Sequence, residues 1–385
     1  MSKTINIAVV FGTRPEAIKV APVIKAAADY PQTKITCIVT AQHRHILDQV
    51  LELFDIVPDY DLNIMQANQT LAGITTRALE GLDKVFSEVK PDIVLAQGDT
   101  STAFVAGLAA FYHRIPVGHI EAGLRTDDIY NPFPEEMNRR LLTRLAALQF
   151  PPTVWARQNL LDEGLKADSM FLTGNTVTDA LQMICRGLPA GLPEDLVRIP
   201  QGRRILLVET HRRENLGEPM AAVCRALLRL VENFPDVELV FSVHPNPKVR
   251  EVVMPMLRDR ARIHLLEPVP YPTLIRLQRE AHLILTDSGG IQEEAPSLGV
   301  PTLVLRRTTE RPEGIKSGNA LLVGTDEENI VREASSLLSD RERYRKMSQA
   351  ASPYGDAKAA PRIIEAILYH FGLRQERPEE FNSPI

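Results

Sequence analysis

Two patterns of apolar residues follow one another repeatedly along this chain. Short apolar runs rich in β-branched residues predict buried strands, whereas longer stretches with an apolar residue every three or four positions predict amphipathic helices. The predicted strands are 5–11, 35–40, 93–97, 117–120, 205–208, 238–243, 264–266, 283–286 and 302–305. The predicted helices include 16–28, 71–89, 101–112, 220–233 and 327–338. This βαβ pattern predicts an α/β protein with doubly wound parallel sheets.

The alternation is interrupted over residues 186–201, where glycine and proline replace any regular period. Such a segment is typical of an interdomain linker. A chain of 385 residues is also too long for one small core. We therefore expect two Rossmann-like domains, residues 1–185 and residues 202–355, which face each other across a cleft. A helix near residues 359–372 is expected to pack back on the first domain.

Composition and charge narrow the class of protein. Hydrophobic residues make up 44% of the chain and charged residues 24%, as in globular proteins. The net charge of −5 argues against a broad basic surface for nucleic acid. No apolar run is long enough to span a membrane and the N-terminal residues lack a signal-peptide cleavage region, so we expect a cytoplasmic protein. Cys37, Cys185 and Cys224 lie in apolar segments and are expected to be buried thiols.

The most informative segment is 283–299, which reads LILTDSGGIQEEAPSLG. An apolar strand stops at a tight turn, and a helix-forming run begins at Ile291. The free N–H groups and the positive end of the helix dipole at such a turn bind anions. Gly289 and Gly290 let a ligand approach the backbone, and Ser288 can add a hydroxyl donor. A plain βα turn would have a similar sequence, so this segment alone leaves phosphate binding undecided.

Acidic residues follow strands of the first predicted domain. Asp99 and Glu121 each follow a predicted strand within two residues, and Glu135 and Glu136 begin a later helix. Acids are also favoured in the first turn of any helix, which gives Glu135 and Glu136 a structural alternative. Three carboxylates from three separate loops nevertheless suit proton transfer to and from a substrate.

Cations and a histidine lie at other strand ends. Arg14 and Lys19 follow the first strand, where they could bind a phosphate or a carboxylate, although surface charges on a capped helix would look the same. His211 ends a strand of the second predicted domain and is followed by Arg212 and Arg213, which suits contact with phosphate. The sequence contains no GxGxxG, Walker loop or metal-ligand spacing, so no cofactor and no metal are predicted.

Eight segments between residue 5 and about residue 372 can be read together: FGTRPEAIK, TAQHRHILDQ, GDT, HIEAGLR, PFPEEMNR, THRREN, TDSGGIQEEAPSLG and TTERPEG. In order and spacing, the set resembles the non-hydrolysing UDP-N-acetylglucosamine 2-epimerases of bacteria and archaea. It implies a GT-B-like fold, with two Rossmann-like domains facing across a cleft, and usually a homodimer. It also implies reversible conversion of UDP-GlcNAc to UDP-ManNAc without a redox cofactor, the first step toward ManNAc-derived surface polysaccharides.

The resemblance also implies a mechanism and a set of site residues. The C2 proton is removed and UDP departs by anti elimination; 2-acetamidoglucal and UDP then recombine with a proton on the other face of C2. Asp99, Glu121 and Glu135 would be the acid/base carboxylates. His211 would stabilise the departing UDP. The implied substrate-binding residues are Arg14 and Lys19 for nucleotide and phosphate, Ser288, Gly289 and Gly290 for the diphosphate, Glu294 for the ribose, Arg311 beside the nucleotide, and Val269 and Leu274 for uracil.

Some bacterial members of this family carry a second, regulatory UDP-GlcNAc site. The matching positions in this chain are Gln42, Gln69, Arg212 and His244. Two positions differ, because His45 stands where the family has glutamine and Asn68 where it has arginine. Arginine provides a forked cation for phosphate, so we expect weak or absent activation by UDP-GlcNAc. Arg307 is a further departure, which adds a cation near the expected nucleotide site.

Three other functions stay open at this point. A GT-B glycosyltransferase would share the fold, but it needs an acceptor and has less use for three acids at the sugar. A hydrolysing epimerase would release free ManNAc and would normally carry a fused kinase domain, for which this chain has no length. A non-catalytic nucleotide-sugar sensor would keep residues 288–290 and Glu294 without needing Asp99, Glu121 or His211.

Overall fold

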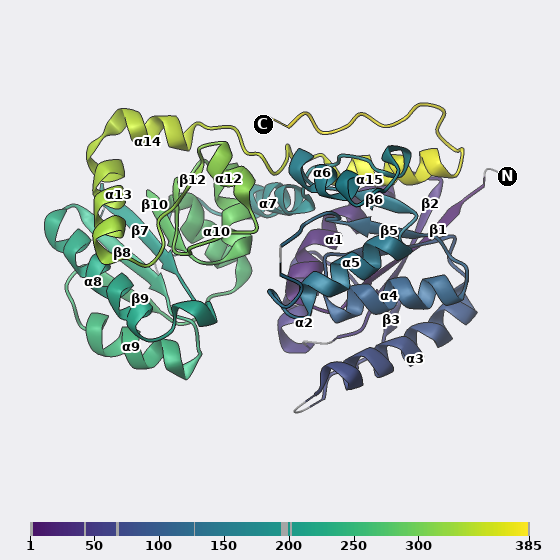
Figure 1. The fold of residues 1–385 in the computed structure, drawn as a ribbon, viewed down its shortest axis with the longest axis horizontal. Coiled ribbons are helices and arrows are strands. Elements are labelled where there is room, and N and C mark those ends of the chain that lie inside the picture. Colours follow the sequence, from purple (N-terminus) through teal and green to yellow (C-terminus); the bar gives the residue numbers. More distant parts are fainter. Residues whose placement is uncertain are drawn as a thin grey trace. The chain divides into compact units, whose positions relative to one another are not determined.

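The computed structural model describes residues 3–41, 44–66, 69–126, 128–193, 199–200 and 202–383, without the side chains of His45 and Ile46. The chain divides into two compact units. The first comprises Met1–Gln182 and Gly355–Ser383, and the second comprises Met183–Tyr354. Each unit is built on a sheet with helices packed on both faces (Figure 1).

The first unit contains a six-stranded parallel sheet in the order β3-β2-β1-β4-β5-β6. Its strands are β1 (Ile5–Phe11), β2 (Thr33–Val39), β3 (Tyr60–Asp61), β4 (Ile93–Gln97), β5 (Val117–Ile120) and β6 (Leu148–Phe150). Its helices are α1 (Arg14–Ala26), α2 (Arg44–Leu53), α3 (Leu71–Val89), α4 (Ser101–Tyr112), α5 (Glu135–Leu145), α6 (Val154–Asp162), α7 (Thr176–Gly187), which continues into the second unit, and α15 (Ala359–His370). Every residue of β4 is buried, as expected for a parallel strand covered on both faces.

The second unit repeats this plan in a sheet with the order β12-β11-β10-β7-β8-β9. Its strands are β7 (Arg204–Glu209), β8 (Val237–Ser242), β9 (Ile263–Leu266), β10 (Leu283–Thr286), β11 (Thr302–Val304) and β12 (Ala320–Leu322). Its helices are α8 (Glu218–Asn233), α9 (Pro247–Leu257), α10 (Tyr271–Glu280), α11 (Gly289–Glu294), α12 (Pro312–Lys316), α13 (Glu327–Ser339) and α14 (Arg341–Ser348). The predicted α/β fold with two Rossmann-like parallel sheets is therefore confirmed.

Each sheet reverses its strand order at one place. In the first unit the reversal lies between β1 and β4, and in the second it lies between β7 and β10. The loops that leave the carboxyl ends of two such strands run in opposite directions, and ligands of doubly wound proteins bind in the crevice between them. The fold therefore identifies the loops after β1, β4, β7 and β10 as the places to look for a site.

The C-terminal residues complete the first unit. Helix α15 begins where the Asp179 carboxylate accepts hydrogen bonds from the N–H groups of Ala359 and Ala360, at 3.2 and 2.9 Å. Further on, the N–H of Phe381 donates to the carbonyl oxygen of Leu172 at 2.8 Å. Burial raises the pKa of Asp179 to about 6, although those N–H groups favour its charged form. The first unit is thus formed by two segments that lie far apart in the sequence.

Several elements differ from the sequence predictions. Strands β3, β6 and β12 were not predicted, because runs of two or three residues carry too little pattern to recognise. The helix expected over residues 291–298 is α11 followed by a 3-10 turn, Ala295–Leu298. Pro296 has no N–H for an α-helical hydrogen bond, which accounts for the change. The linker was expected to begin at residue 186, but α7 continues to Gly187, so the first two residues of the expected linker are helical.

The cysteine prediction is correct for two of the three residues. Cys37 and Cys224 are buried, and burial raises the pKa of each thiol to about 12. Cys185 is only partly buried. Over the residues that the structure describes, no helix has the length and apolar character needed to cross a bilayer.

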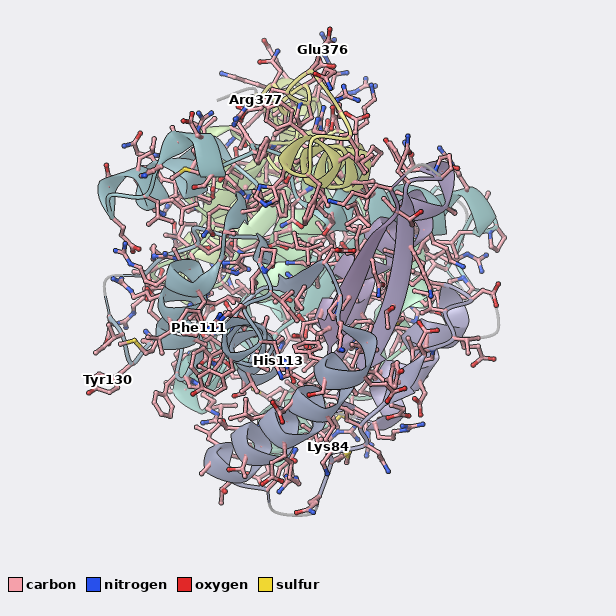
Figure 2. The ribbon with its side chains drawn as sticks, turned by 90° about the vertical axis from the view of Figure 1, so that its right-hand side faces the viewer. Lys84, Phe111, His113, Tyr130, Glu376 and Arg377 are labelled. Carbon is pink, nitrogen blue, oxygen red and sulfur yellow. The ribbon has the colours of Figure 1, made fainter. Side chains whose placement is uncertain are left out.

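The first unit also exposes large aromatic side chains. Phe111, Tyr112, Tyr130 and Phe133 are each more than half exposed. Figure 2 shows Phe111 and Tyr130 on the surface of this unit. The rings of Tyr130 and Phe133 lie 6.4 Å apart, so part of this apolar surface is contiguous. Contiguous exposed apolar surface is typical of protein interfaces.

A glycine after β5 permits a test of the packing in the first unit. Gly123 has a φ of +91°, and a methyl group on it would overlap the carbonyl oxygen of Ala156. We expect Gly123→Ala to lower the free energy of unfolding by about 2–4 kcal/mol, because both the backbone conformation and the clash oppose a side chain. Urea unfolding followed by the fluorescence of Trp155, the single tryptophan, measures this loss in the same unit.

Gly164→Ala is the matched control. Gly164 has a φ of +80° but no atom near the added methyl group, so only the backbone cost of about 1 kcal/mol applies. Equal losses in the two variants would show that the contact with Ala156 is unimportant.

Candidate active site

In the first unit the predicted carboxylate Glu121 is held by polar side chains from three other elements. Glu121 follows β5, has a φ of +66° and is 8% exposed. Its Oε1 lies 2.5 Å from Nζ of Lys19, and its Oε2 accepts a hydrogen bond from Nε2 of Gln97. Nδ2 of Asn175 donates to Oε1 at 3.4 Å. A left-handed conformation at a non-glycine residue costs free energy and is concentrated at functional sites, so this geometry fits a catalytic role for Glu121.

The loop that carries Asp99 is fastened to the helix that carries Glu135. Nη2 of Arg139 lies 2.6 Å from Oδ2 of Asp99, and Nδ2 of Asn138 donates to the carbonyl oxygen of Asp99 at 3.0 Å. Arg139 is buried and lies one helical turn after Glu135. Glu135 is the first residue of α5, and its side chain is partly buried. Asp99 and Glu135 therefore belong to one connected group of loops.

A further carboxylate, Glu16, joins the two loops at the point where the sheet reverses. It accepts hydrogen bonds from the N–H groups of Gly12 and Thr13, at 3.1 and 2.8 Å, and from the hydroxyl of Thr13 at 2.7 Å. The hydroxyl of Thr100 donates to its other oxygen at 2.6 Å. Burial raises the pKa of Glu16 to about 7, although these hydrogen bonds favour the anion. Glu16 thus ties the start of α1 to the loop of Asp99.

In the second unit Asp287 joins the loops after β7 and β10. Asp287 has no exposed surface. Its carboxylate accepts hydrogen bonds from the N–H groups of His211 and Arg212, each at 3.0 Å, and from Nδ2 of Asn215 at 2.7 Å. The hydroxyl of Thr210 is a further donor. The turn that begins with Ser288 and the loop that carries His211 are therefore held at one edge of the sheet.

The side chain of His211 is partly exposed beside this turn. Its Nδ1 lies 2.6 Å from Oε1 of Glu209, the last residue of β7. The hydrogen bond to Glu209 raises the pKa of His211 against the effect of burial. The ring stacks on His244 with the ring centres 5.3 Å apart. Burial, together with the charge on His211, lowers the pKa of His244, so the two rings differ in their readiness to bind a proton.

The predicted phosphate turn is accompanied by a cation. Ser288 is the N-cap of α11, and the guanidinium of Arg311 covers Gly289 so closely that a Cβ there would lie 3.1 Å from Cζ. Nε of Arg311 donates to Oε1 of Glu293 at 2.9 Å. Burial opposes a charge on Glu310, but Arg311 and Arg306 lower the pKa of Glu310 to about 2. Positive charge is thus held against the turn at Gly289.

Glu294 lies one helical turn after Gly290 and is held by α10. Its Oε1 accepts a hydrogen bond from the hydroxyl of Tyr271 at 2.9 Å, and its Oε2 accepts one from Nε2 of Gln278 at 2.7 Å. A Cβ on Gly290 would be 3.8 Å from Oε1 of Glu294. A carboxylate has further lone pairs, so these two bonds leave capacity for ligand hydroxyls.

The two residues predicted to flank uracil lie at and just before α10. Val269 packs against the buried cluster that contains Leu266 and Ile291, and Leu274 is partly buried on the helix. Their contact with a base stays a prediction.

Glu209, His211 and Asp287 have ligand atoms within 4.8 Å of one another, which is close enough to hold a metal ion. Hydrogen bonding accounts for this cluster without an ion. Both oxygens of Asp287 accept protein donors, and Nδ1 of His211 faces Glu209. We therefore describe the three residues as a hydrogen-bonded group.

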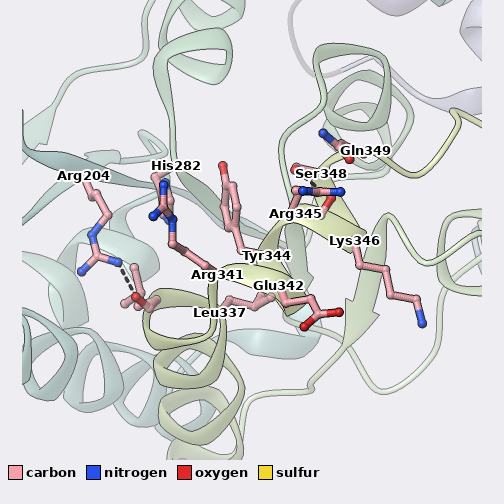
Figure 3. Close-up of a pocket in the computed structure, with 11 residues that line it drawn as sticks. Arg204, His282, Leu337, Arg341, Glu342, Tyr344, Arg345, Lys346, Ser348 and Gln349 are labelled. Carbon is pink, nitrogen blue, oxygen red and sulfur yellow. Dashed lines mark hydrogen bonds between the residues drawn. The ribbon is translucent and has the colours of Figure 1, made fainter.

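A hollow of about 1010 Å³ in the second unit lies elsewhere. Figure 3 shows Arg204, His282, Tyr344 and Arg345 around it, with the parallel rings of His282 and Tyr344 stacked at 4.1 Å. Arg204 begins β7 and His282 directly precedes β10, so the hollow lies at the amino ends of these strands. Ligands of doubly wound sheets bind at the carboxyl ends, and none of the predicted site residues lines this hollow.

Some of the predicted site residues do not belong to the hydrogen-bond networks described above. Arg14 is exposed at the start of α1. Oε1 of Gln69 accepts hydrogen bonds from Gln66 N–H at 3.4 Å and from Nη2 of Arg77 at 3.3 Å. Gln42, Asn68 and the side chain of His45 lie outside the described residues. Arg212 and His244 lie beside His211 in the second unit, and the regulatory site as a whole stays a prediction.

Several important residues were missed from the sequence. Gln97 is the last residue of β4 and Glu209 the last residue of β7, so their place at strand ends was a signal that could have been used. Asp287 directly precedes the predicted turn, and Arg139 follows Glu135 by one helical turn. Asn175 gave no signal, because its contact with Glu121 spans 54 positions.

Known proteins resemble this chain along nearly its whole length. A family model described as UDP-N-acetylglucosamine 2-epimerase matches residues 25–368. UDP-N-acetylglucosamine 2-epimerase of Bacillus subtilis (strain 168) is 52% identical over 381 residues, which cover 99% of this chain and 100% of that protein.

Two solved structures resemble both the sequence and the fold. The UDP-GlcNAc 2-epimerase from Neisseria meningitidis bound to UDP-GlcNAc gives a TM-score of 0.88 at 45% identity, with 94% of this chain and 100% of that chain covered. The co-structure of S. aureus MnaA with UDP gives a TM-score of 0.90 at 43% identity, with 98% and 100% covered.

The fold and the polar groups at the carboxyl ends of its strands define a GT-B-like enzyme with two Rossmann-like domains. The matches above add the family. The chain belongs to the UDP-N-acetylglucosamine 2-epimerase family, and it is an isomerase.

The ion pair between Lys19 and Glu121 can be tested by a double-mutant cycle. The two side chains are 11% and 6% exposed. Lys19→Met leaves the buried Glu121 carboxylate without its cation, and breaking such a pair costs about 3–5 kcal/mol. We expect Lys19→Met/Glu121→Gln to lose less stability than the sum of the single variants, since the double variant carries no unpaired charge. Urea unfolding of all four proteins, followed by the fluorescence of Trp155, measures the coupling. Strictly additive losses would rule out a direct interaction.

Proposed function

We propose that this protein interconverts UDP-GlcNAc and UDP-ManNAc by reversible epimerisation at C2. The observation that carries the proposal is the buried Lys19–Glu121 pair, with its strained backbone, at the carboxyl edge of a sheet in a chain of this family. A carboxylate held in this way by surrounding donors is suited to proton transfer. The Neisseria meningitidis relative, whose structure is bound to UDP-GlcNAc, supports the same substrate class.

The proposed reaction is an elimination followed by an addition. A carboxylate removes the proton from C2, and the electron pair of that C–H bond forms a double bond between C1 and C2. The C1–O bond breaks at the same time, and UDP leaves with its electron pair, so that 2-acetamidoglucal remains. UDP then adds back to C1 while a proton is delivered to the other face of C2. The reaction is balanced without an electron acceptor, which agrees with the absence of a dinucleotide fingerprint from the sequence.

The first unit would supply the acid and the base. Asp99, Glu121 and Glu135 are the candidates, and the Arg139–Asp99 pair together with the Lys19–Glu121 pair places cations beside two of them. Lys19 and Arg14 would also approach the phosphate side of the substrate. Which carboxylate acts on which face of C2 depends on the position of the sugar.

The second unit would bind UDP. Ser288, Gly289 and Gly290 would hold the diphosphate at the start of α11, with the cation of Arg311 beside them. His211 would stabilise the charge that develops on the leaving group. Glu294 would accept hydrogen bonds from the ribose hydroxyls, and Val269 and Leu274 would flank uracil.

We also infer a homodimer. The exposed aromatic residues Phe111, Tyr112, Tyr130 and Phe133 provide apolar surface that a second copy could cover. A place in the synthesis of ManNAc-derived polysaccharides is an expectation that follows from the family resemblance, and a cytoplasmic location is an expectation that follows from the sequence pattern.

Epimerisation in heavy water tests the reaction. We expect purified protein with UDP-GlcNAc alone to give a mixture of UDP-GlcNAc and UDP-ManNAc, with deuterium at C2 of both, because the C2–H bond is broken in each direction. Proton NMR of the sugar signals measures both results. A glycosyltransferase or a non-catalytic sensor would give no epimer, and a product that keeps its proton at C2 would exclude the elimination.

Removal of the titrating groups tests the acid and base. Asp99→Asn, Glu121→Gln and Glu135→Gln keep the size of the side chain, and we expect each to lower kcat about 10²-fold or more, as is typical for general acid–base catalysis. The control is Glu88→Gln, which removes one carboxylate from α3, outside the site networks. Initial rates for the variants measure the effect, and near wild-type turnover in all three would assign these carboxylates a structural role.

A further inference from the structure

The last residue of β7 makes a short contact with the histidine of the proposed UDP site. Oε1 of Glu209 lies 2.6 Å from Nδ1 of His211. Glu209 is itself held in the sheet, where it is in register with Thr286 of β10, and the Thr286 hydroxyl donates to its Oε2 at 3.4 Å. This carboxylate is therefore fixed by the two strands at which the sheet reverses its order.

The contact determines which nitrogen of His211 is left for a ligand. A carboxylate accepts hydrogen bonds, so Nδ1 carries the hydrogen and Nε2 is the other ring position. The side chain is 33% exposed, so the ring is accessible from solvent. The backbone of His211 is fixed separately, because its N–H donates to Asp287 at 3.0 Å. Glu209, at the end of β7, therefore sets the position of the hydrogen on the ring. Glu209 and Asp287, which follows β10, together set the orientation of the ring.

The charges around the ring act in opposite directions. Glu209 and Asp287, whose Oδ1 lies 3.7 Å from Nδ1, favour a protonated ring, whereas burial and the cation of Arg212 oppose it. The stacked ring of His244 is the other titratable group beside it, and its pKa is lowered by burial and by His211 and Arg250, against the effect of Glu209 and Asp287. The balance raises the pKa of His211, and the hydrogen bond to Glu209 is the largest contribution.

We propose that Glu209 is a positioning residue that holds His211 as an imidazolium with Nε2–H free to donate to the departing diphosphate. When the C1–O bond breaks and UDP takes the electron pair, this hydrogen bond strengthens as negative charge develops on the phosphate oxygens. No proton is consumed, because the same hydrogen bond weakens when UDP adds back. The proposal rests on the proposed epimerase function and assigns the state of one of its groups.

The sign of the expected pH effect follows from the charge of Glu209. A carboxylate beside His211 keeps the ring protonated to higher pH, so activity that depends on the imidazolium is retained further into the alkaline range. Glu209→Gln preserves an oxygen that can accept from Nδ1 but removes the negative charge. The alkaline limb of kcat should therefore move to lower pH. On that limb, a displacement of one pH unit lowers turnover about tenfold.

Three variants separate charge from orientation. Glu209→Gln should retain near wild-type kcat at acidic pH and lose it at lower pH than the wild type does. Glu209→Ala also removes the acceptor and should lower kcat at every pH, since the ring is no longer held. The control is Glu342→Gln, which removes the same charge beside the hollow at the amino ends of β7 and β10. Strand β7 has six residues, so this edge is roughly 20 Å from the carboxyl edge.

An NMR titration of the histidine Cε1–Hε1 signals provides a readout that does not depend on activity. Comparison with His211→Asn assigns the signal of His211, which should titrate at lower pH in Glu209→Gln and unchanged in Glu342→Gln. An unchanged titration, or an unchanged alkaline limb in Glu209→Gln, overturns the proposal even when the wild type epimerises. A wild type without epimerase activity overturns the proposed function instead, and the titration still shows whether Glu209 controls the charge of His211.

Discussion

The pairing of β1 with β4 in the first unit, and of β7 with β10 in the second, is the constraint on which the candidate site residues of each unit depend. Parallel pairing brings the carboxyl ends of these strands to one edge, although their loops are far apart in the sequence. Thr100 can therefore reach Glu16 across 84 positions, and the N–H of His211 can reach Asp287 across 76. In each unit a buried carboxylate that follows one of the two strands accepts hydrogen bonds from donors that follow the other. The loops are consequently fixed by the sheet and need little further structure of their own.

Most of the fold could be predicted because buried strands of four or more residues have a recognisable apolar pattern. The bounds of β1, β4, β5 and β10 agree with the apolar runs in the sequence, because each run ends where polar loop residues begin. The short strand β3 illustrates the limit. Its two residues are defined by their register with Ile38 and Val39 of β2, and nothing local distinguishes them from a loop. The 3-10 turn after α11 shows a different limit, since one proline altered a helical pattern that was otherwise regular.

The site was predictable in its residue types and less so in its connections. Asp99, Glu121, His211 and Ser288 each follow a strand within two residues, so strand prediction alone placed each of them at the carboxyl edge of its own sheet. Their partners are fixed by tertiary packing: Gln97 meets Glu121 through the pairing of β4 with β5, and Arg139 meets Asp99 through the packing of α5. These partners determine the charge and the orientation of the Glu121 and Asp99 carboxylates, which are the properties that catalysis requires. The position of a residue in the sequence could suggest that it belongs to the site. Its hydrogen-bond and ion-pair partners depend on how the strands and helices pack.

The hydrogen bonds from Ala359 and Ala360 to Asp179 have a consequence for synthesis of the protein. The first unit is discontinuous, and the whole of the second unit is inserted between its two segments. During translation Asp179 emerges about 180 residues before the helix that it caps. The second unit can therefore fold while the first still lacks α15, and the first can be completed only when residues 355–383 have left the ribosome. Until then, the apolar surface that Ile363 and Ile367 of α15 cover in the folded protein stays exposed on the nascent chain, and transiently exposed apolar surface favours aggregation.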